Sequence, residues 1–360
     1  HHLNVNVIVR EMCCGHEHTL LLSDGGLLWS WGNNWRGQLG HSDFSSCNKP
    51  MLVRFKNRDS SKVHLKNKVL GMFGGEAEEI GNSFNQSATH SNTNTIVHAN
   101  NRTKSISCGS YHSACVNDQG YLYTWGASEC LGREAPPLRE GQKARGKGSN
   151  DTSNPSLVMF FASNKSFGGQ KLVVSNLCCG EQHVHCFATP TLRNNTLSIG
   201  QAPLYAWGSN KCGQLGIGES KEKLVYRPVR VAGIPAVDLD ELKHSHGADL
   251  LRAESSDVVS SKGPIIVANM AANYPDAVQL RSCGRHVMLM IAGKLWGWGW
   301  NNRGQVGINS KADCWVPTEI KFPLVVNGRT RGQYNSKIKS VAVGWHHSSA
   351  VCDDGAVFVW

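Results

Sequence analysis

Short apolar runs separated by turn residues dominate the chain and predict strands rather than helices. In the first stretch, residues 18–22 and 27–31 are apolar runs on either side of Asp24-Gly25-Gly26. An acidic residue followed by glycine supplies the positive φ that a tight hairpin turn needs. The same kind of turn recurs at residues 118–120 and 353–355. The pattern therefore predicts a series of antiparallel hairpins.

A motif of glycine, histidine and tryptophan repeats along the chain and sets the phase of these hairpins. The histidine and the tryptophan are 13 residues apart in the first, second and fifth copies, 12 in the fourth and 24 in the third. The long third spacing predicts an inserted loop at about residues 190–203. The five copies are Gly15/His18/Trp31, Gly109/His112/Trp125, Gly180/His183/Trp207, Gly284/His286/Trp298 and Gly344/His347/Trp360.

A second glycine motif follows the tryptophan. It reads Gly-Gln-Leu-Gly at 37–40 and 213–216, Gly-Gln-Val-Gly at 304–307, and only Leu131-Gly132 in the second copy. One hairpin cannot bury its own faces, so neighbouring units must stack. Radial stacking of small antiparallel sheets is the arrangement of a β-propeller.

These motifs make the chain resemble the regulator of chromosome condensation (RCC1-type) repeat family. The resemblance implies an all-β propeller, and the propellers of this family form a closed ring of seven blades. Four full repeats and one half repeat are visible, so we expect an incomplete ring with long loop insertions, belonging to a longer protein. Within the family, the fourth copy, with Ile291-Ala292-Gly293 and Trp298-Gly299-Trp300-Asn301, is similar to secretion-regulating guanine nucleotide exchange factors.

We interpret residues 1–360 as a single domain. The expected repeat cores lie near 12–53, 105–132, 177–216, 280–320 and 340–360, and the expected insertions are 41–104, 133–172 and 217–278. The insertions are rich in Asn, Ser, Lys, Arg and Gly, which is typical of surface loops. Residues 237–254 form a candidate pair of short helices within the last insertion.

The periodic histidines could be metal ligands or structural residues. Whole repeats separate them, which favours a structural role in which the ring nitrogens bond neighbouring backbone. The cysteines before the glycines could pair with these histidines as nucleophiles, but their recurrence favours core packing as reduced thiols; they are Cys14, Cys108, Cys179 and Cys283. Trp296, Trp298 and Trp300 could stack on bases, but their alternation favours packing between blades.

Charge adds a feature that the repeat does not explain. Lys and Arg number 37 against 27 Asp and Glu, a net charge of +10. Basic residues concentrate in segments 51–70, 131–150 and 321–340, which we expect on corresponding connections of one rim. These segments are either a partner-binding surface or solvated loops. The candidate binding residues are Arg54, Lys56, Arg58, Lys62, Lys66, Lys68, Arg139, Lys143, Arg145, Lys147, Arg329, Arg331, Lys337 and Lys339.

The sequence shows no phosphate-cradling glycine motif, and we expect no cofactor, no metal, no small-molecule substrate and no bond-making chemistry. The resemblance implies guanine nucleotide exchange on a small GTPase, although no exchange residue can be carried over. A scaffold for an acidic protein partner and a chromatin or nucleic-acid binder remain as alternatives. Apolar runs are too short to span a membrane. The thirteen cysteines are an odd number, and several stand inside apolar runs, which indicates reduced thiols, so we expect a cytoplasmic or nuclear protein.

Overall fold

The computed structural model describes residues 7–55, 102–133, 150–163, 171–190, 204–234, 278–326 and 329–360. This part of the chain is built of antiparallel sheets, as the hairpin pattern predicted. Its only helical turns are η1 (Ser128–Cys130) and α1 (Met159–Ala162). The expected helix pair at 237–254 lies outside the described residues.

Five small sheets follow one another, and in each the strands pair in chain order. Blade 1 contains β1 (Val9–Cys14), β2 (His18–Ser23), β3 (Leu28–Gly32) and β4 (Cys47–Leu52). Blade 2 contains β5 (Thr103–Cys108), β6 (His112–Asn117), β7 (Leu122–Gly126) and β8 (Thr152–Leu157). Blade 3 contains β9 (Leu172–Cys179), β10 (His183–Pro190), β11 (Leu204–Ser209) and β12 (Leu224–Arg230).

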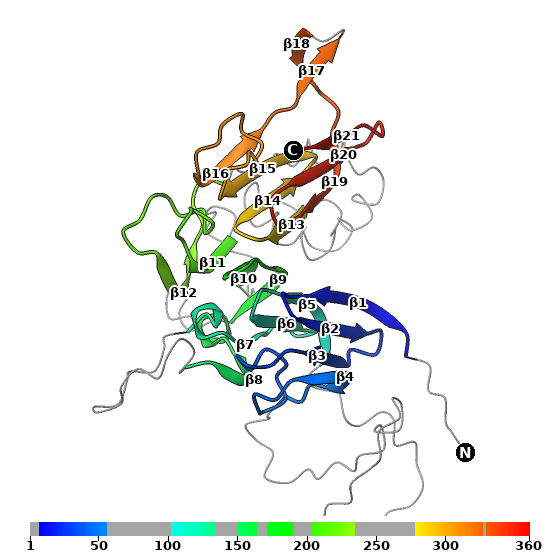
Figure 1. Cartoon of the computed structure of the whole chain (residues 1–360), viewed down its shortest axis with the longest axis vertical. Helices are drawn as coiled ribbons and strands as arrows, with labels where there is room; N and C mark the ends of the chain where they lie inside the picture. The colour runs from blue at the N-terminus through cyan, green and yellow to red at the C-terminus, as the bar shows by residue number, and fades with distance from the viewer. Residues whose placement is uncertain are drawn as a thin grey trace, which may run out of the picture.

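Blade 4 contains β13 (Val278–Cys283), β14 (His286–Ile291), β15 (Lys294–Gly299) and β16 (Cys314–Ile320). Blade 5 has three strands, β19 (Ile338–Val343), β20 (Ser348–Cys352) and β21 (Val357–Val359). In the chain order, a separate hairpin of β17 (Pro323–Val326) and β18 (Arg329–Gln333) comes after blade 4 and before blade 5. The first strand of each blade packs on the blade before it, so β5 contacts β1, β9 contacts β5, β13 contacts β9 and β19 contacts β13 (Figure 1).

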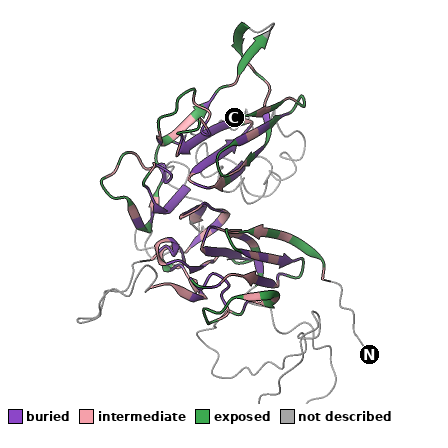
Figure 2. Ribbon diagram, viewed as in Figure 1, coloured by how far each residue is buried: buried purple, intermediate pink, exposed green. Residues whose placement is uncertain are grey.

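Apolar clusters fill the spaces between the blades. The largest joins blades 3 and 4 and includes Leu215, Val287 and Trp298, while another joins blades 4 and 5. Figure 2 shows buried strands inside the blades and exposed residues along the β17–β18 hairpin. Each blade therefore completes its core with the next one, as the repeat argument requires.

The repeated tryptophan connects each blade to the one before it. Trp125 Nε1 donates to the carbonyl of Gln38 at 2.8 Å, and Trp207, Trp298 and Trp360 donate in the same way to Cys130, Gln214 and Gln305. The final glycine of the second motif lies against the same ring, because a Cβ at Gly40 would come within 2.9 Å of Trp125 Nε1. The second motif is therefore the socket for the next blade's tryptophan.

Two of the fourth strands differ from the sequence-based expectation. Strands β8 and β12 lie inside 133–172 and 217–278, which we expected to be loop. Both pair with the third strand of their sheet through a register shift. Their sequences, TSNPSL and LVYRPVR, mix polar residues with a proline and so carry little strand signal.

Candidate functional site

Four of the five repeated histidines are buried parts of the blade interfaces. His18 Nε2 lies 2.9 Å from Ser113 Oγ of the next blade, and His286 is placed in the same way against Ser348. These Nε2 atoms pair with a serine hydroxyl instead of the expected backbone. Burial lowers the pKa of His18 to about 3 and that of His286 to about 4. Within the described residues, no three His, Cys, Asp or Glu side chains come together as a metal site.

The histidine of the fifth copy, His347, differs from the other four. It is exposed and stands just before β20, which begins at Ser348, so the expectation of a buried, hydrogen-bonded strand histidine is wrong for His347. The physical reason is its place in the stack, since no described blade packs on blade 5 from beyond and covers the ring. The contact between the histidine and the glycine of its own motif is kept, because a Cβ on Gly344 would lie 2.2 Å from His347 Cε1.

The periodic cysteines do not form thiol–histidine dyads with the neighbouring histidines. Cys14 ends β1 and His18 begins β2, so the two residues lie on neighbouring strands. Cys179 is buried as expected, but Cys14 is exposed, because β1 has no blade packed on its outer side among the described residues. Burial raises the pKa of the Cys179 thiol well above its usual range, which disfavours the reactive thiolate.

The basic segments do not share one position in the repeat. Segments 51–70 and 321–340 connect successive blades, whereas 131–150 connects β7 to β8 within one blade. The expectation of corresponding connections is therefore wrong for 131–150. Arg54 is exposed after β4, and Arg329 and Arg331 are exposed on β18. Lys337 comes just before β19 and Lys339 is the second residue of that strand. The other candidates lie outside the described residues: Lys56, Arg58, Lys62, Lys66, Lys68, Arg139, Lys143, Arg145 and Lys147.

The loops at one end of the blades form a surface that we call the loop face. It consists of the connections between the first and second strands, at 15–17, 109–111, 180–182, 284–285 and 344–347, together with the described parts of those between the third and fourth strands. Backbone hydrogen bonds join the first set from blade to blade. His16 N donates to Ser110 O at 3.3 Å, Ser110 N to Glu181 O at 3.1 Å, and Glu181 N to Gly284 O at 2.7 Å.

Aromatic side chains gather on the loop face. The rings of Trp35 and Tyr111 are 5.1 Å apart, and His16 lies 5.7 Å from Tyr111 and 6.4 Å from Trp345. The last contact connects blade 1 with blade 5. Trp35 is 51% exposed and Trp345 is 39% exposed. Large exposed aromatic side chains in one place are typical of a protein interface.

Two ion-pair groups support this aromatic surface. Arg36 of blade 1 reaches Glu129 at 2.8 Å and forms a close bidentate pair with Asp151, both on blade 2. Burial disfavours the charged form of Glu129, but a backbone hydrogen bond and Arg36 hold its pKa below the usual value. Arg285 pairs with Glu181 at 2.6 Å and lies 5.9 Å from the Trp300 ring. Trp300 follows β15 and is partly exposed, so only Trp296 and Trp298 pack in the core as expected.

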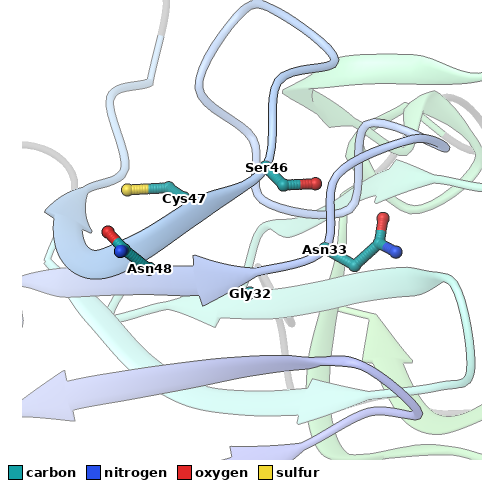
Figure 3. A pocket seen from close by; sticks show the side chains of 5 residues that line it. All are labelled: Gly32, Asn33, Ser46, Cys47 and Asn48. Carbon is teal, nitrogen blue, oxygen red and sulfur yellow. The ribbon is translucent and has the colours of Figure 1, made fainter.

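A shallow hollow of about 650 Å³ opens beside blade 1. It is lined by residues at the end of β3 and the start of β4, namely Gly32, Asn33, Ser46, Cys47 and Asn48 (Figure 3). Its lining residues are small and uncharged, and it holds neither the charged groups nor the aromatic rings of the loop face. The hollow carries no evident chemistry of its own.

The charge pattern of the sequence pointed to basic loops as the candidate functional region and not to the loop face. The available signal was the variation inside the repeated motif. Between the glycine and the histidine stand His16-Glu17, Ser110-Tyr111, Glu181-Gln182, Arg285 and Trp345-His346. The repeated glycine and histidine determine the backbone at these loops, whereas the side chains between them differ from copy to copy.

Comparison with known proteins agrees with this geometry. The family described as "Regulator of chromosome condensation (RCC1) repeat" matches residues 25–66, 203–241 and 292–351, and a second family of the same description matches 9–38 and 104–130. The chain belongs to the RCC1-repeat family. The described blades are accordingly RCC1-type propeller blades, as the sequence motifs predicted.

Relatives of this RCC1-repeat chain differ in kind. It is 26% identical over 367 residues to the "Ultraviolet-B receptor UVR8" of Arabidopsis thaliana, covering 97% of this chain and 64% of UVR8. It is 25% identical over 305 residues to human "Protein RCC2", covering 81% of this chain and 56% of that protein. The structure of human WBSCR16 aligns with a TM-score of 0.50 and 17% identity, covering 98% of this chain and 61% of that one.

The chain thus spans less than two thirds of the length of these relatives. The narrower similarity of copy four to secretion-regulating exchange factors stays a prediction. No helix among the described residues is long and apolar enough to cross a membrane.

Proposed function

We propose that this RCC1-repeat propeller binds a protein partner through its loop face and regulates a small GTPase as a guanine nucleotide exchange factor. The observation that carries the binding surface is the cluster of Trp35, Tyr111, His16 and Trp345. Tryptophan, tyrosine and arginine are the residues most enriched at the energetic centres of interfaces. The GTPase as partner rests on the family resemblance.

The arrangement suits a rigid contact surface. Arg36 holds blades 1 and 2 together directly beneath Trp35, since its guanidinium lies 5.6 Å from the Trp35 ring. A side chain held in place before binding loses less conformational entropy on association. A pre-ordered aromatic surface is therefore well suited to distinguish the conformations of a partner.

Nucleotide dependence tests the proposal. The purified chain is titrated against a panel of small GTPases, each nucleotide-free and GDP-loaded, and release of a fluorescent GDP analogue is followed. We expect one GTPase to bind more tightly when nucleotide-free and to release nucleotide faster. Trp35→Ala should weaken that binding roughly 10-fold or more, as loss of an interface anchor does.

Met159→Ala is the matched control, because Met159 is similarly exposed but belongs to α1, between β8 and β9. It should leave binding unchanged. If no GTPase in the panel prefers the nucleotide-free state or releases nucleotide faster, exchange activity is refuted. Binding without faster release would favour the scaffold alternative.

A second candidate, nucleic-acid or chromatin binding, is favoured by the β17–β18 hairpin. This two-stranded ribbon projects from the blades (Figure 1), and every residue of β18 is exposed. Segment 321–340 contains five basic residues and no acidic one. An isolated ribbon is marginally stable in water, and the major groove of DNA accepts a two-stranded ribbon.

Salt dependence tests this second candidate. Binding to a duplex DNA is measured by fluorescence anisotropy at several salt concentrations for the native chain and for an Arg329→Gln/Arg331→Gln variant. Loss of two phosphate contacts should reduce the slope of log K against log salt by roughly 2. Arg303→Gln, on an exposed loop-face arginine, is the control. An unchanged slope in the double variant rules out the ribbon as the contact.

A further inference from the structure

Two cysteines of neighbouring blades meet at the interface of blades 1 and 2. Cys13 lies on β1 and Cys108 ends β5, and their Sγ atoms are 2.9 Å apart. A disulfide bond has a length of about 2.05 Å, so less than about 1 Å of movement separates the thiols from a bond. Both cysteines are free thiols in the structure.

Regular pairing fixes both residues in place. Cys13 pairs with Leu20 across β1 and β2, and Cys108 pairs with Ser113 across β5 and β6. Cys108 Sγ also lies 3.5 Å from the carbonyl oxygen of Cys13, and the backbone bond from His16 to Ser110 joins the two blades just beyond. The proximity of the sulfurs therefore follows from the blade packing and not from mobile loops.

The pair occupies a repeating contact of the fold. The Cys-Gly motifs align Cys13 with Ser107, and Cys108 with Cys179. At the interface of blades 2 and 3, Ser107 Oγ accepts a hydrogen bond from Cys179 N at 2.9 Å. Equivalent positions are therefore occupied by a serine and a buried cysteine between blades 2 and 3, and by two cysteines with neighbouring thiols between blades 1 and 2.

The two cysteines are less buried than the neighbouring Cys179, although burial raises the pKa of the Cys108 thiol above its usual range. Cys13 and Cys108 are only partly buried, whereas Cys179 is fully buried. We propose that Cys13 and Cys108 form an oxidant-responsive disulfide that covalently joins blades 1 and 2 when the protein meets a peroxide. This site goes beyond the proposed partner-binding function and does not depend on it.

The chemistry balances with hydrogen peroxide as the oxidant. One thiolate attacks the peroxide, its O–O bond breaks, and a sulfenic acid and hydroxide form. The second thiolate attacks the sulfenic sulfur, the S–S bond forms, and the S–O bond breaks with release of hydroxide. The two protons of the original thiols convert both hydroxides to water. Two thiols and one peroxide give one disulfide and two waters.

The test is peptide mapping of the whole chain, oxidised with hydrogen peroxide and digested without reductant. We expect a cross-linked peptide joining Cys13 to Cys108 and a mass lower by two hydrogens. The thermal midpoint should rise by roughly 5 °C, because the cross-link restricts the unfolded chain. Dithiothreitol should reverse both changes.

Serine variants locate the bond. Cys13→Ser and Cys108→Ser should each abolish the cross-linked peptide and the rise in midpoint, and the repeat already accepts serine at the position of Cys13. Cys14→Ser is the matched control, since Cys14 is adjacent, exposed and should leave the cross-link intact. Should a serine variant fail to fold, mapping of the Cys14→Ser chain alone decides the question. The proposal is overturned if either cysteine forms its disulfide with any other cysteine. It is also overturned if Cys13 and Cys108 can still be alkylated after the peroxide has oxidised Cys14.

Discussion

At the residue scale, the glycine and histidine of the repeat form one unit. A Cβ on Gly109 would lie 1.9 Å from His112 Cε1, and one on Gly15 would lie 2.2 Å from the same atom of His18. The glycine is required because the imidazole ring lies directly over it. In the fourth copy the spacing is one residue shorter, and Gly284 instead takes a φ of 49° with its would-be Cβ facing the carbonyl of Trp345.

Replacement of Gly109 by alanine tests this unit. The added methyl group would displace the buried His112 ring, so we expect the free energy of unfolding to fall by about 1–3 kcal/mol. Gly25→Ala is the control, because its Cβ would meet nothing closer than 3.7 Å; it should change stability by less than about 0.5 kcal/mol. Urea denaturation measures both, and equal effects would contradict the steric argument.

The repeated motif predicts a structural role for these residues but does not reveal their partners. The motif gives the spacing of His18 from its own glycine, whereas Ser113 belongs to the next blade, 95 residues away. Ser113 Oγ in turn donates to Gln38 O, which also accepts from Trp125. Such a network joins two motifs in space, and nothing in either motif alone reveals it.

At the scale of elements, the fourth strand of each complete blade is the one that the apolar pattern detects least well. Each of these strands contains a proline: Pro50, Pro155, Pro228 and Pro317. Each also pairs with its neighbour through a register shift. Proline and bulges are typical of edge strands, where they discourage pairing with another chain. The three inner strands are predictable from alternation, while the outer one was partly taken for loop.

The tryptophan socket predicts a large loss of stability when its indole is replaced. Trp298→Phe removes the donor to Gln214 O and leaves space in a fully buried site, so stability should fall by about 2–4 kcal/mol. Trp31 holds the equivalent position in blade 1 and is partly exposed, and its indole has no hydrogen-bond partner among the described residues. Trp31→Phe should therefore cost less than about 1 kcal/mol. Guanidinium denaturation compares the two, and similar losses would refute the role of the socket.

At the scale of the whole molecule, every interface between described blades contains buried neutral histidine. Burial lowers the pKa of His112 to about 4 and that of His185 to about 3, and lowers the pKa of His183 as well. The repeated glycine, histidine and tryptophan motif predicted the number and phase of the blades, because these depend on local sequence. The motif could not predict the exposure of His347, which depends on what packs against blade 5. The positions of the charged segments were also less predictable, since they depend on where each fourth strand falls.

The buried histidines predict acid sensitivity. The unfolded chain takes up protons near pH 6.5, whereas the folded chain keeps the rings neutral to lower pH. The free energy of unfolding should therefore fall as the pH drops from 7 to 5.5, by up to about 1.4 kcal/mol per pH unit for each histidine. The slope of the free energy of unfolding against pH reports how many protons unfolding takes up, and His286→Gln should lower that number by about one. Denaturation at several pH values measures it, and a flat profile would contradict burial of neutral rings.

The direction of the tryptophan bonds has a consequence for synthesis on the ribosome. Each indole donates to a carbonyl earlier in the chain, from Trp125 to Gln38 through to Trp360 and Gln305. A growing chain exposes its N-terminal part first. Every new blade therefore emerges to find its socket already made, and the long connections delay its arrival without removing the surface on which it docks.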